Sequence, residues 1–567
     1  MFGFYRIAAA VPELKVADVE YNANEIIRLS EEAARNGAAL VLFPKLALTS
    51  ATCGSLFTQK RLTDAAGAAA CRIAEAFRDS GMIIVLGLPL KEGPATAVLS
   101  GGTVTALVPE QDDLILDAGA ATLGLGTTAA ALTLMPDAEP AIAGSIRNKR
   151  DQLKALSACH KTVMVYASAG VTESTTDAVY GGYAAICENG VFLTENKPFN
   201  RKSSIIYADT DLEMLSHIRQ NNEPEEDMEI TPLRDDLASV QYRTVDPLPF
   251  LPECPADCAD IFEIQTAGLV KRLACSGSQK AVIGISGGLD STLAILVAAE
   301  AVKRLGWKPE QLVALTMPGF GTTSRTKSNS EALSLLLGCD LRTVDITNAC
   351  LQHFNDIGHD PAVLDVTYEN VQARERTQIL MDTANRERGL VVGTGDLSEI
   401  ALGWSTYNAD HMSMYNVNCG VTKTLVRVMV DWYAENTGDG AMKKVLKDVL
   451  ATPVSPELLP ADKTGAIAQK TESILGAYEL HDFYLYHFIY GGAAPEKIRY
   501  LAELAFGNKY PAEELDRTLD LFFKRFFTQQ FKRSCCPDGP QTGIVSLSPR
   551  TAWQMPSDAA MTLWRRS

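Results

Sequence analysis

The fold of this chain is decided by the stretch Ala281-Val-Ile-Gly-Ile-Ser-Gly-Gly-Leu-Asp-Ser-Thr292 and the residues that follow it to Glu300. Val282 to Ile285 is a short apolar run typical of a buried parallel strand. The run Leu293-Ala-Ile-Leu-Val-Ala-Ala299 predicts a helix directly behind that strand. The glycine-rich residues between them therefore form a turn that joins a strand to a helix.

This turn has the chemistry of a phosphate site. Gly287 and Gly288 let the backbone approach a ligand closely, and three hydroxyls lie beside the unpaired N–H groups of the helix start: Ser286, Ser291 and Thr292. The carboxylate of Asp290 would repel phosphate unless a cation such as Mg²⁺ lies between them. The alternative is a glycine-rich helix start that binds nothing.

The spacing of the turn identifies its type. It is not the Walker loop, because no lysine follows the glycines. It resembles instead the SGGxDS loop of the ATP pyrophosphatases, which cleave ATP between the α and β phosphates. The resemblance implies ATP as a substrate.

The length, charge and composition of the chain exclude several classes of protein. A chain of 567 residues is too long for one core, and its net charge of −17 argues against general binding to nucleic acid. The twelve cysteines lack the CxxC or histidine spacing of a zinc site. The sequence shows no signal-peptide pattern at its start and no run of 18 apolar residues, so we expect a cytoplasmic protein without a membrane span.

The pattern of elements predicts two domains. Apolar runs at 6–11, 38–43 and 82–88 alternate with amphipathic segments at 22–35 and 63–78, which is a β–α–β rhythm. Apolar runs at 163–167 and 183–187 continue the sheet to about residue 210. We therefore expect a first domain over residues 1–213, a linker over 214–260 that is polar and proline-rich, and a second domain over 261–567.

The second domain alternates strands and helices like a doubly wound parallel sheet. A helix at 262–273 precedes the glycine turn, and further strands are expected at 312–317 and 389–394. Ligands bind such sheets at the carboxyl ends of the strands. The segment Gly393-Thr-Gly-Asp-Leu-Ser-Glu399 would bring Glu399 within reach of a cation shared with Asp290. The alternative is that Glu399 only balances the dipole of its helix.

Three basic residues are candidates for contacts with phosphate. Arg374 and Arg376 lie close together at a helix start, where they could clamp phosphate or pair with Glu369 and Glu375 on the surface. Lys423, within Gly420-Val-Thr-Lys-Thr424, is a further candidate cation.

Several motifs in one order resemble the NAD⁺ synthetases. They are SGGLDST, TMPGFGT, residues 368–378, GTGDLSE, the run Thr406-Tyr-Asn-Ala-Asp-His-Met-Ser-Met-Tyr415, Ser455-Pro-Glu-Leu-Leu-Pro460 and Gln469-Lys-Thr-Glu472. Over nearly the whole chain the sequence resembles the long, glutamine-dependent kind. The resemblance implies an N-terminal nitrilase-like αββα sandwich and a C-terminal ATP pyrophosphatase domain, related to the adenine nucleotide alpha hydrolases.

The resemblance also implies a reaction and roles in it. ATP adenylates the nicotinate carboxylate of deamido-NAD⁺ with release of pyrophosphate, and ammonia then displaces AMP. Residues of the glycine turn would hold ATP and metal, with Glu399 as the second metal ligand, and Thr394 and Arg374 would lie beside the nucleotide. The contacts with deamido-NAD⁺ and phosphate would come from Asp410, Glu457 and Lys423. Lys532, Arg533 and Arg550 match basic tail segments that close this site, and their alternative is a solvated basic face.

The N-terminal domain departs from the family's pattern. A nitrilase-like glutaminase needs a glutamate base, a lysine for the oxyanion and a cysteine nucleophile. This chain has Phe43-Pro-Lys-Leu46, so Lys45 stands where the base is expected. Glu110 falls at the place of the lysine, and Thr128 or a neighbour at that of the cysteine. We expect Lys45 and Glu110 to form an ion pair in a retained fold without its reaction.

We therefore expect a magnesium-dependent, ammonia-using NAD⁺ synthetase. Its amidase domain would act as a scaffold and subunit interface of a homo-oligomer, and its ammonia would be free or come from another protein. One alternative is a working glutaminase with an unusual nucleophile such as Cys53 or Cys159. Others are a nucleotide-sensing pseudoenzyme and an ATP pyrophosphatase that amidates or thiolates a different acceptor.

Overall fold

The computed structural model describes residues 4–118, 122–126, 130–212, 215, 245–252, 254–321, 324–452 and 474–565. The chain divides into two compact units. The first comprises Met1–Ser174 and Val179–Ser239, and the second comprises Thr175–Ala178 and Val240–Ser567. In the described part of the chain, no helix combines the length and the apolar character needed to cross a membrane.

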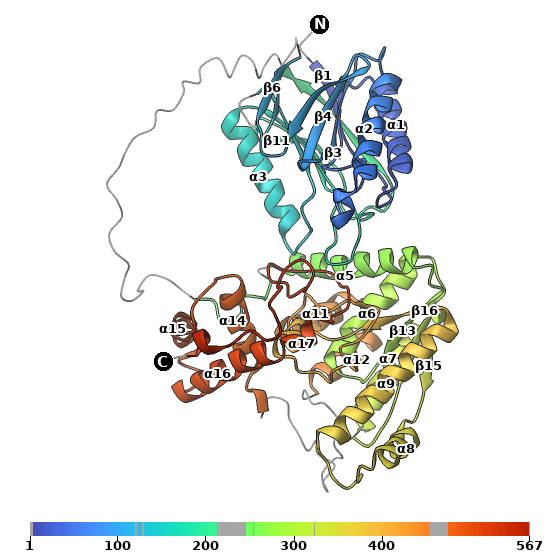
Figure 1. Ribbon diagram of the computed structural model, residues 1–567, viewed down its shortest axis with the longest axis vertical. Helices are drawn as coiled ribbons and strands as arrows, with labels where there is room; N and C mark the ends of the chain where they lie inside the picture. The colour runs from blue at the N-terminus through green and yellow to red at the C-terminus, as the bar shows by residue number, and fades with distance from the viewer. Residues whose placement is uncertain are drawn as a thin grey trace. The chain divides into compact units, whose positions relative to one another are not determined.

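The first unit contains two six-stranded sheets (Figure 1). The first sheet has the order β12-β1-β2-β3-β4-β5. Its strands are β1 (Phe4–Val11), β2 (Leu40–Leu42), β3 (Ile83–Pro89), β4 (Pro94–Ser100), β5 (Thr103–Pro109) and β12 (Ser204–Asp211). β1, β2 and β3 run parallel, because α1 (Val19–Arg35) and α2 (Lys60–Ala76) form the crossovers between them.

The second sheet has the order β11-β10-β9-β8-β7-β6. Its strands are β6 (Leu114–Asp117), β7 (Thr122–Leu125), β8 (Leu132–Asp137), β9 (Val163–Ser168), β10 (Ala184–Glu188) and β11 (Val191–Glu195). Buried side chains of both sheets, such as Val85 and Val165, form one cluster between them. α3 (Ser145–His160) packs on the outer face of this second sheet. The first unit is therefore the expected αββα sandwich.

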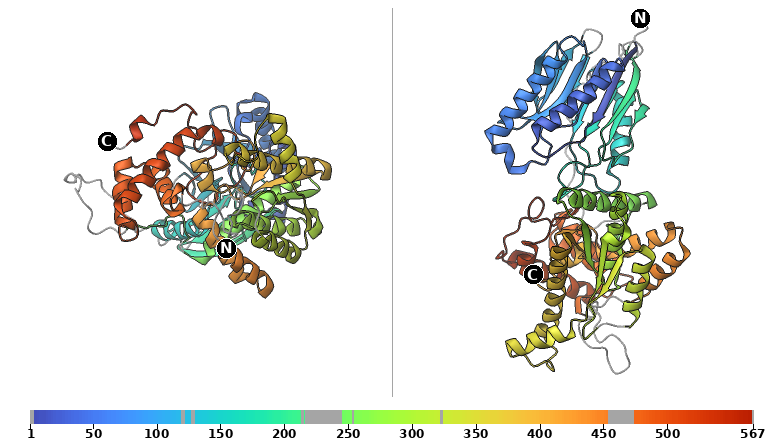
Figure 2. Two further views of the ribbon diagram at one scale, coloured as in Figure 1. Left: turned by 90° about the horizontal axis from the view of Figure 1, so that it is seen from below. Right: turned by 90° about the vertical axis from the view of Figure 1, so that its right-hand side faces the viewer.

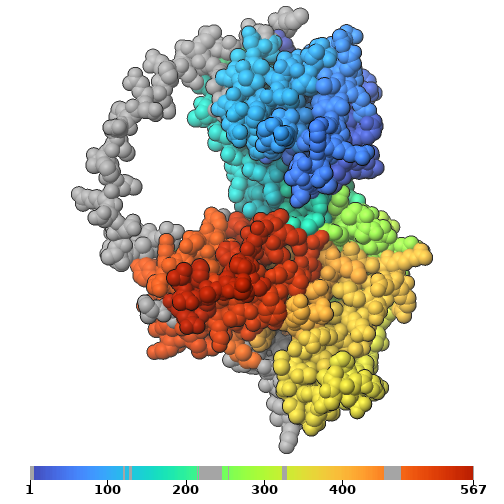
Figure 3. Space-filling view, in the orientation of Figure 1, coloured from blue at the N-terminus to red at the C-terminus, as the bar shows by residue number. Residues whose placement is uncertain are grey.

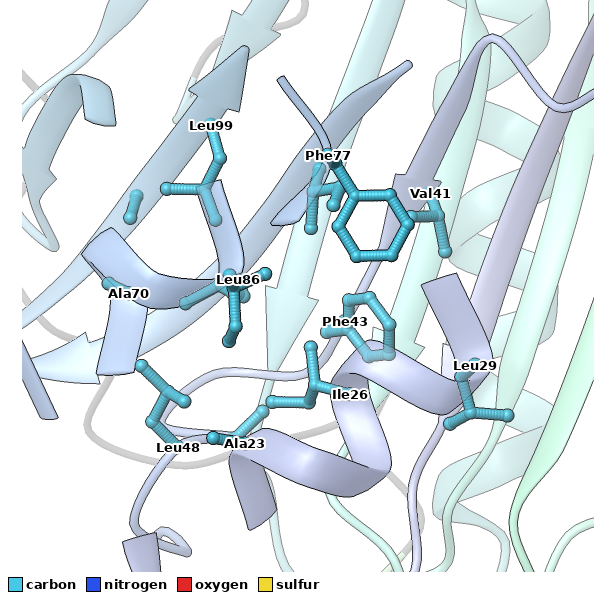
Figure 4. Packing of buried hydrophobic residues seen from close by; sticks show 14 of the residues in the cluster. Ala23, Ile26, Leu29, Val41, Phe43, Leu48, Ala70, Phe77, Leu86 and Leu99 are labelled. Atoms are coloured by element: carbon cyan, nitrogen blue, oxygen red, sulfur yellow. The ribbon is translucent and has the colours of Figure 1, made fainter. Parts of the chain in front are cut away.

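A second hydrophobic cluster explains how the outer helices attach to the first sheet. Ile26 of α1 lies beside Phe43, which follows β2, and Leu29 and Leu86 belong to the same cluster (Figure 4). α1 carries apolar residues on one face, so burying that face drives the docking of the helix. This packing holds the end of β2, and with it Lys45, in a fixed position.

The second unit is built on a parallel sheet with the order β15-β14-β13-β16-β17. Its strands are β13 (Lys280–Gly284), β14 (Leu312–Thr316), β15 (Asp340–Thr343), β16 (Gly389–Gly393) and β17 (Tyr415–Asn416). Helices lie on both sides of this sheet (Figure 2). They are α5 (Pro255–Cys275), α6 (Leu289–Arg304), α7 (Ser324–Leu337), α8 (Thr347–Ile357), α9 (Val366–Glu387), α11 (Lys423–Asn436) and α12 (Gly440–Leu450).

The C-terminal helices add a layer of their own to the second unit. α14 (Tyr478–Ile489), α15 (Pro495–Phe506) and α16 (Ala512–Thr528) share an aromatic core with the short α10 (Leu397–Leu402). α17 (Gln530–Arg533) follows, and the chain then runs on to Arg565 with only the turn η3 (Thr562–Trp564). Figure 3 shows these residues as one continuous surface coloured orange to red.

Two expectations from the sequence need correction. The runs at 163–167 and 183–187 do not continue the first sheet: they form β9 and β10 of the second, because β6 to β11 pair only with one another. The helix expected at 262–273 begins at Pro255, within the expected linker, because a proline at the first helical position needs no hydrogen bond there. Most of the expected linker, residues 214–260, lies outside the described residues.

Candidate functional site

The glycine turn joins β13 to α6 as the sequence predicts. Gly287 has a φ of 82°, a conformation that side chains disfavour, and Gly288 caps α6. Ser286 Oγ lies 3.3 Å from Ser291 Oγ, and Thr292 Oγ1 donates to the carbonyl of Gly288 at 2.8 Å. The hydroxyls therefore hold the turn in shape around the start of the helix.

A pocket opens where β13, β14 and β16 end. The residues expected at the nucleotide that line it are Ser286, Asp290, Ser291, Thr394, Glu399 and Asp410. Arg376 of α9 also lines it, and its Nε donates to the carbonyl of Met317 at 3.0 Å. The carboxyl ends of parallel strands thus bring these side chains together, as such sheets do.

One lysine lies among three carboxylates beside this pocket. Lys423 Nζ lies 2.7 Å from Asp290 Oδ2, 2.6 Å from Asp396 Oδ2 and 2.9 Å from Glu399 Oε1. Burial raises the pKa of Glu399 to about 7 and also raises the pKa of Asp396, while Lys423 opposes both shifts. Burial would lower the pKa of Lys423, but the carboxylates raise it well above its usual value.

Sequence reasoning missed Asp396. It is fully buried, caps the start of α10 and accepts a hydrogen bond from the backbone N–H of Glu399 at 2.8 Å. An acidic residue directly after a strand and three residues before a glutamate is a helix-start pattern, which was the available signal.

The three carboxylates fit a magnesium ion. Oxygen atoms of Asp290, Asp396 and Glu399 lie within 4.8 Å of one another. Asp290 Oδ1 is buried and has no hydrogen-bond partner within the described chain. Hard oxygen ligands are those that Mg²⁺ prefers, so these residues could hold it beside the glycine turn.

Buried amides and a buried acid support this cluster from behind. Asn418 Nδ2 donates to the carbonyls of Asp290 at 2.9 Å and Thr394 at 3.0 Å, which ties the first turn of α6 to the residue that follows β16. Asp482 of α14 accepts hydrogen bonds from Ser398 Oγ and Thr424 Oγ1. Ser398 Oγ accepts in turn from the backbone N–H of Lys423 at 2.8 Å. The support comes from elements distant in sequence.

A smaller cavity adjoins the carboxylates on the side of the tail. Asp410 and Lys532 line it together with Gly395, Glu399, His411, Arg533, Cys536 and Pro537. Burial raises the pKa of Asp410, whose Oδ1 accepts from the backbone N–H of Thr406 at 2.7 Å. Lys532 Nζ donates to the carbonyls of Gly403 at 2.9 Å and Ser405 at 2.7 Å.

Several expected contacts lie elsewhere. Arg374 is exposed, donates to the carbonyl of Tyr407 at 3.4 Å and is not among the residues lining the pocket. Arg533 is buried and donates to the carbonyl of Ala401 at 2.7 Å, so it is no part of a solvated basic face. Arg550 pairs with Asp177 at 2.7 Å. Glu457 and Thr128 lie outside the described residues.

In the first unit, the predicted ion pair between Lys45 and Glu110 is confirmed. Lys45 follows β2 and Glu110 follows β5, so the pair joins the carboxyl ends of two strands at the same edge of the first sheet. The chain at Lys45 and Leu46 crosses directly over Gly87 of β3, where a Cβ would lie 2.6 Å from the Cα of Lys45. An ammonium group paired in this way cannot accept a proton from a thiol.

Cys53 and Cys187 of the first unit are poor candidates for nucleophiles, whereas Cys71 and Cys159 are exposed. Cys53 is buried, its Sγ donates to the carbonyl of Thr49 at 3.1 Å, and burial raises its pKa to about 11. The nearby carboxylate of Glu173 is occupied by hydrogen bonds, among them one from Thr52 Oγ1 at 2.6 Å. Cys187 is buried in the second sheet, and burial raises its pKa as well.

Fold and site together define a two-domain ligase, with a carbon–nitrogen hydrolase fold ahead of an ATP-dependent synthase domain. Residues 6–115 match the carbon-nitrogen hydrolase family, and residues 261–533 match the NAD synthase family. A glutamine-dependent NAD(+) synthetase of Mycobacterium leprae is 32% identical over 99% of this chain and 97% of its own length. The enzyme of Mycobacterium tuberculosis is likewise 32% identical over 99% of this chain.

Solved structures agree in fold. The glutamine-dependent NAD(+) synthetase of Cytophaga hutchinsonii superposes with a TM-score of 0.78 over 98% of both chains, at 17% identity. That of Acinetobacter baumannii, solved with adenosine diphosphate, gives a TM-score of 0.64 over 99% of this chain and 98% of its own. This chain belongs to the glutamine-dependent NAD(+) synthetase family, and the activity it carries is NAD⁺ synthesis.

Proposed function

We propose that this chain amidates deamido-NAD⁺ with ammonia and does not hydrolyse glutamine. The observation that carries the proposal is the ion pair between Lys45 and Glu110, two positions where the family's reaction needs a base and a free lysine. Of the four described cysteines of the first unit, Cys53 and Cys187 are buried, and burial raises the pKa of each of these two thiols. In this proposal the chain differs in its nitrogen source from its relatives, which are named glutamine-dependent.

The proposed reaction has two steps in the second unit. The nicotinate carboxylate attacks the α phosphate of ATP, and the bond to the β phosphate breaks to release pyrophosphate. Ammonia then attacks the carbonyl of the acyl adenylate, AMP leaves, and the nitrogen loses a proton. The adenylate is needed because a free carboxylate has no usable leaving group.

The residues of the pocket would act mainly by position and charge. Ser286, Ser291 and the glycine turn would hold the phosphates, and Thr394 would lie beside the nucleotide. Asp290, Asp396 and Glu399 would hold Mg²⁺, which when bound neutralises phosphate charge. Lys423 would supply a further cation to the phosphates. Asp410 and Lys532 would contact deamido-NAD⁺ in the adjoining cavity.

The test compares two nitrogen sources. Purified protein with deamido-NAD⁺, ATP and Mg²⁺ should form NAD⁺, AMP and pyrophosphate with ammonium salts but not with glutamine. At a fixed total of ammonium the rate should rise with pH, because neutral ammonia is the nucleophile. Equal rates with glutamine would end the proposal.

The alternative is a glutaminase that uses an unusual thiol, and the names of the relatives favour it. If glutamine supports synthesis, the variants C53S and C159S identify the sulfur responsible. A glutamine-dependent rate lost in one variant, with the ammonium-dependent rate retained, would establish the alternative.

A further inference from the structure

Four residues from the loop between β9 and β10 belong to the second unit. They are Thr175–Ala178, and their neighbours in that unit are the chain after α17 and helix α5. The carbonyl of Thr176 accepts from the N–H of Gly539 at 3.1 Å, and that of Asp177 accepts from the N–H of Gln541 at 3.2 Å. This backbone pairing holds the segment 539–541.

The side chain of Asp177 binds the tail at two further points. Its Oδ1 accepts from Ser548 Oγ at 2.7 Å and from Arg550 Nε at 2.8 Å, and its side chain is only 14% exposed. A largely buried carboxylate paired with a guanidinium is costly to leave half-paired, so the two fix each other's position.

Arg550 passes this constraint to the wall of the small cavity. Its Nη1 donates to the carbonyl of Cys536 at 3.1 Å, and its Nη2 donates to that of Pro537 at 3.3 Å. Cys536 and Pro537 line the cavity that holds Asp410 and Lys532. The side chain of Asp177 is therefore connected to the cavity wall through Arg550, which also pairs with Asp538 at 3.3 Å.

The same stretch is pressed closely against the sheet. The N–H of Asn416 in β17 donates to the carbonyl of Asp538 at 2.7 Å, and Arg272 of α5 pairs with Asp538 at 2.5 Å. A Cβ on Gly539 would lie 2.1 Å from the carbonyl oxygen of Asn416. The backbone of residues 538–541 is thus bonded both to Thr176 and Asp177 and to Asn416 of the sheet.

We propose that Asp177 is a positioning residue for the synthetase reaction: it acts through Arg550 to hold the cavity wall at Cys536 and Pro537. The inference rests on the proposed binding of deamido-NAD⁺ beside Asp410 and Lys532. It also gives the N-terminal sequence a task that needs no glutaminase, because the loop that carries Asp177 is part of that sequence.

The test separates binding of the two substrates. D177A should raise the KM for deamido-NAD⁺ about 10-fold, with the KM for ATP changed by less than about 2-fold, because the ATP pocket has other walls. The KM of D177N for deamido-NAD⁺ should lie between those of the unmodified protein and D177A. R550A should reproduce the effect, and D177A/R550A should be no worse than R550A, since the two side chains act as one unit.

A matched control is D516A, which removes a carboxylate paired with Arg499 at 2.7 Å in the same unit but outside both cavities. It should leave both KM values unchanged. Hydrogen exchange in the ligand-free protein should become faster at residues 534–541 in D177A and stay unchanged in D516A.

Three results would overturn the inference. One is an unchanged KM for deamido-NAD⁺, even if hydrogen exchange becomes faster. A second is an equal rise in both KM values with a lower unfolding temperature, which indicates a general folding role. A third is unchanged exchange at 534–541. The hydrogen-exchange measurement needs no turnover. It therefore tests whether Asp177 holds residues 534–541 even if the proposed function is wrong.

Discussion

Lys423 lies at the centre of the carboxylate cluster of the second unit. Its ammonium group lies within 2.9 Å of three carboxylates that could also hold a metal ion. An ammonium and a divalent cation cannot share that space, because their charges repel at contact distance. We therefore expect the ammonium to compete with a metal for the same oxygens.

We predict that K423Q binds a divalent cation more tightly in the absence of ATP. Removing the competing charge should increase the affinity for Mn²⁺ at least about 10-fold, measured by titration without nucleotide. The variant leaves three carboxylates, of which Asp396 is fully buried, without their cation, so its unfolding temperature should fall and recover on adding Mn²⁺. K303Q, on the exposed face of α6, is the control. Equal affinities in K423Q and the unmodified protein would refute the competition.

The ion pair in the first unit allows a charge-exchange experiment. K45E would set two carboxylates against each other and lower the unfolding temperature of that unit. The cost is about 1 kcal/mol at most, because Glu110 is 56% exposed. K45E/E110K should restore the temperature by exchanging the partners, and it should not restore glutamine hydrolysis. If the unfolding temperature stays low in K45E/E110K, the loss of the ion pair does not explain the destabilisation by K45E.

The site residues that the sequence predicts best are those that follow a recognisable strand. Asp290, Thr394 and Glu399 line one pocket because β13 and β16 are neighbours, which apolar runs and chain order indicate. Asp396 follows a helix-start pattern, but sequence spacing does not indicate its contact with Lys423 or the bonds of Asn418 to backbone carbonyls. Arg550 looks basic and exposed in sequence, whereas its role depends on Asp177, 373 positions away.

At the scale of elements, burial separates what could be predicted from what could not. β1, β3 and β13 are apolar runs buried on both faces and were expected close to their observed bounds. β5 and β11 alternate more and less exposed residues, a pattern that favours an edge or half-buried strand, but they lack the continuous apolar run on which the other strands are predicted. The division of strands between two sheets depends on pairing over long distances.

Helix α14 contains a buried histidine that makes the C-terminal helices sensitive to acid. His481 is 2% exposed, lies 2.9 Å from the carbonyl of Leu475 through Nε2, and burial lowers its pKa to about 4. An unfolded histidine takes up a proton near pH 6.5, so the unfolded state binds more protons between about pH 6.5 and 4. Stability therefore falls as the pH drops through this window.

We predict that H481Q reduces this loss. In the unmodified protein His481 alone should cost on the order of 3 kcal/mol between pH 7 and pH 4, which is about 1.4 kcal/mol for each unit of the pKa difference. The unfolding temperature of the second unit, measured against pH, should fall less steeply in H481Q than in the unmodified protein. H353Q, at an exposed position of α8, is the control. Parallel curves for H481Q and the unmodified protein would contradict the assignment.

At the scale of the whole molecule, the two units have different proposed roles. The proposed loss of glutamine hydrolysis concerns the first unit alone, and the two cavities proposed to bind substrates are lined by residues of the second. Each unit has hydrophobic clusters of its own, so each can unfold as a cooperative body. Ligands should then stabilise the units unequally.

We predict two thermal transitions, of which only one responds to substrates. ATP with Mg²⁺ and deamido-NAD⁺, each at 100 times its dissociation constant, should add about 2.7 kcal/mol per ligand to the second unit, because a ligand that binds only the folded state stabilises it. Glutamine at any concentration should move neither transition, since Lys45 stands where the base is expected and is paired with Glu110. Calorimetry can assign the transitions through K45E, which lowers only that of the first unit. A glutamine-dependent rise in that same transition would show that the amidase site still binds its substrate, and the ion pair of Lys45 and Glu110 would then have to open.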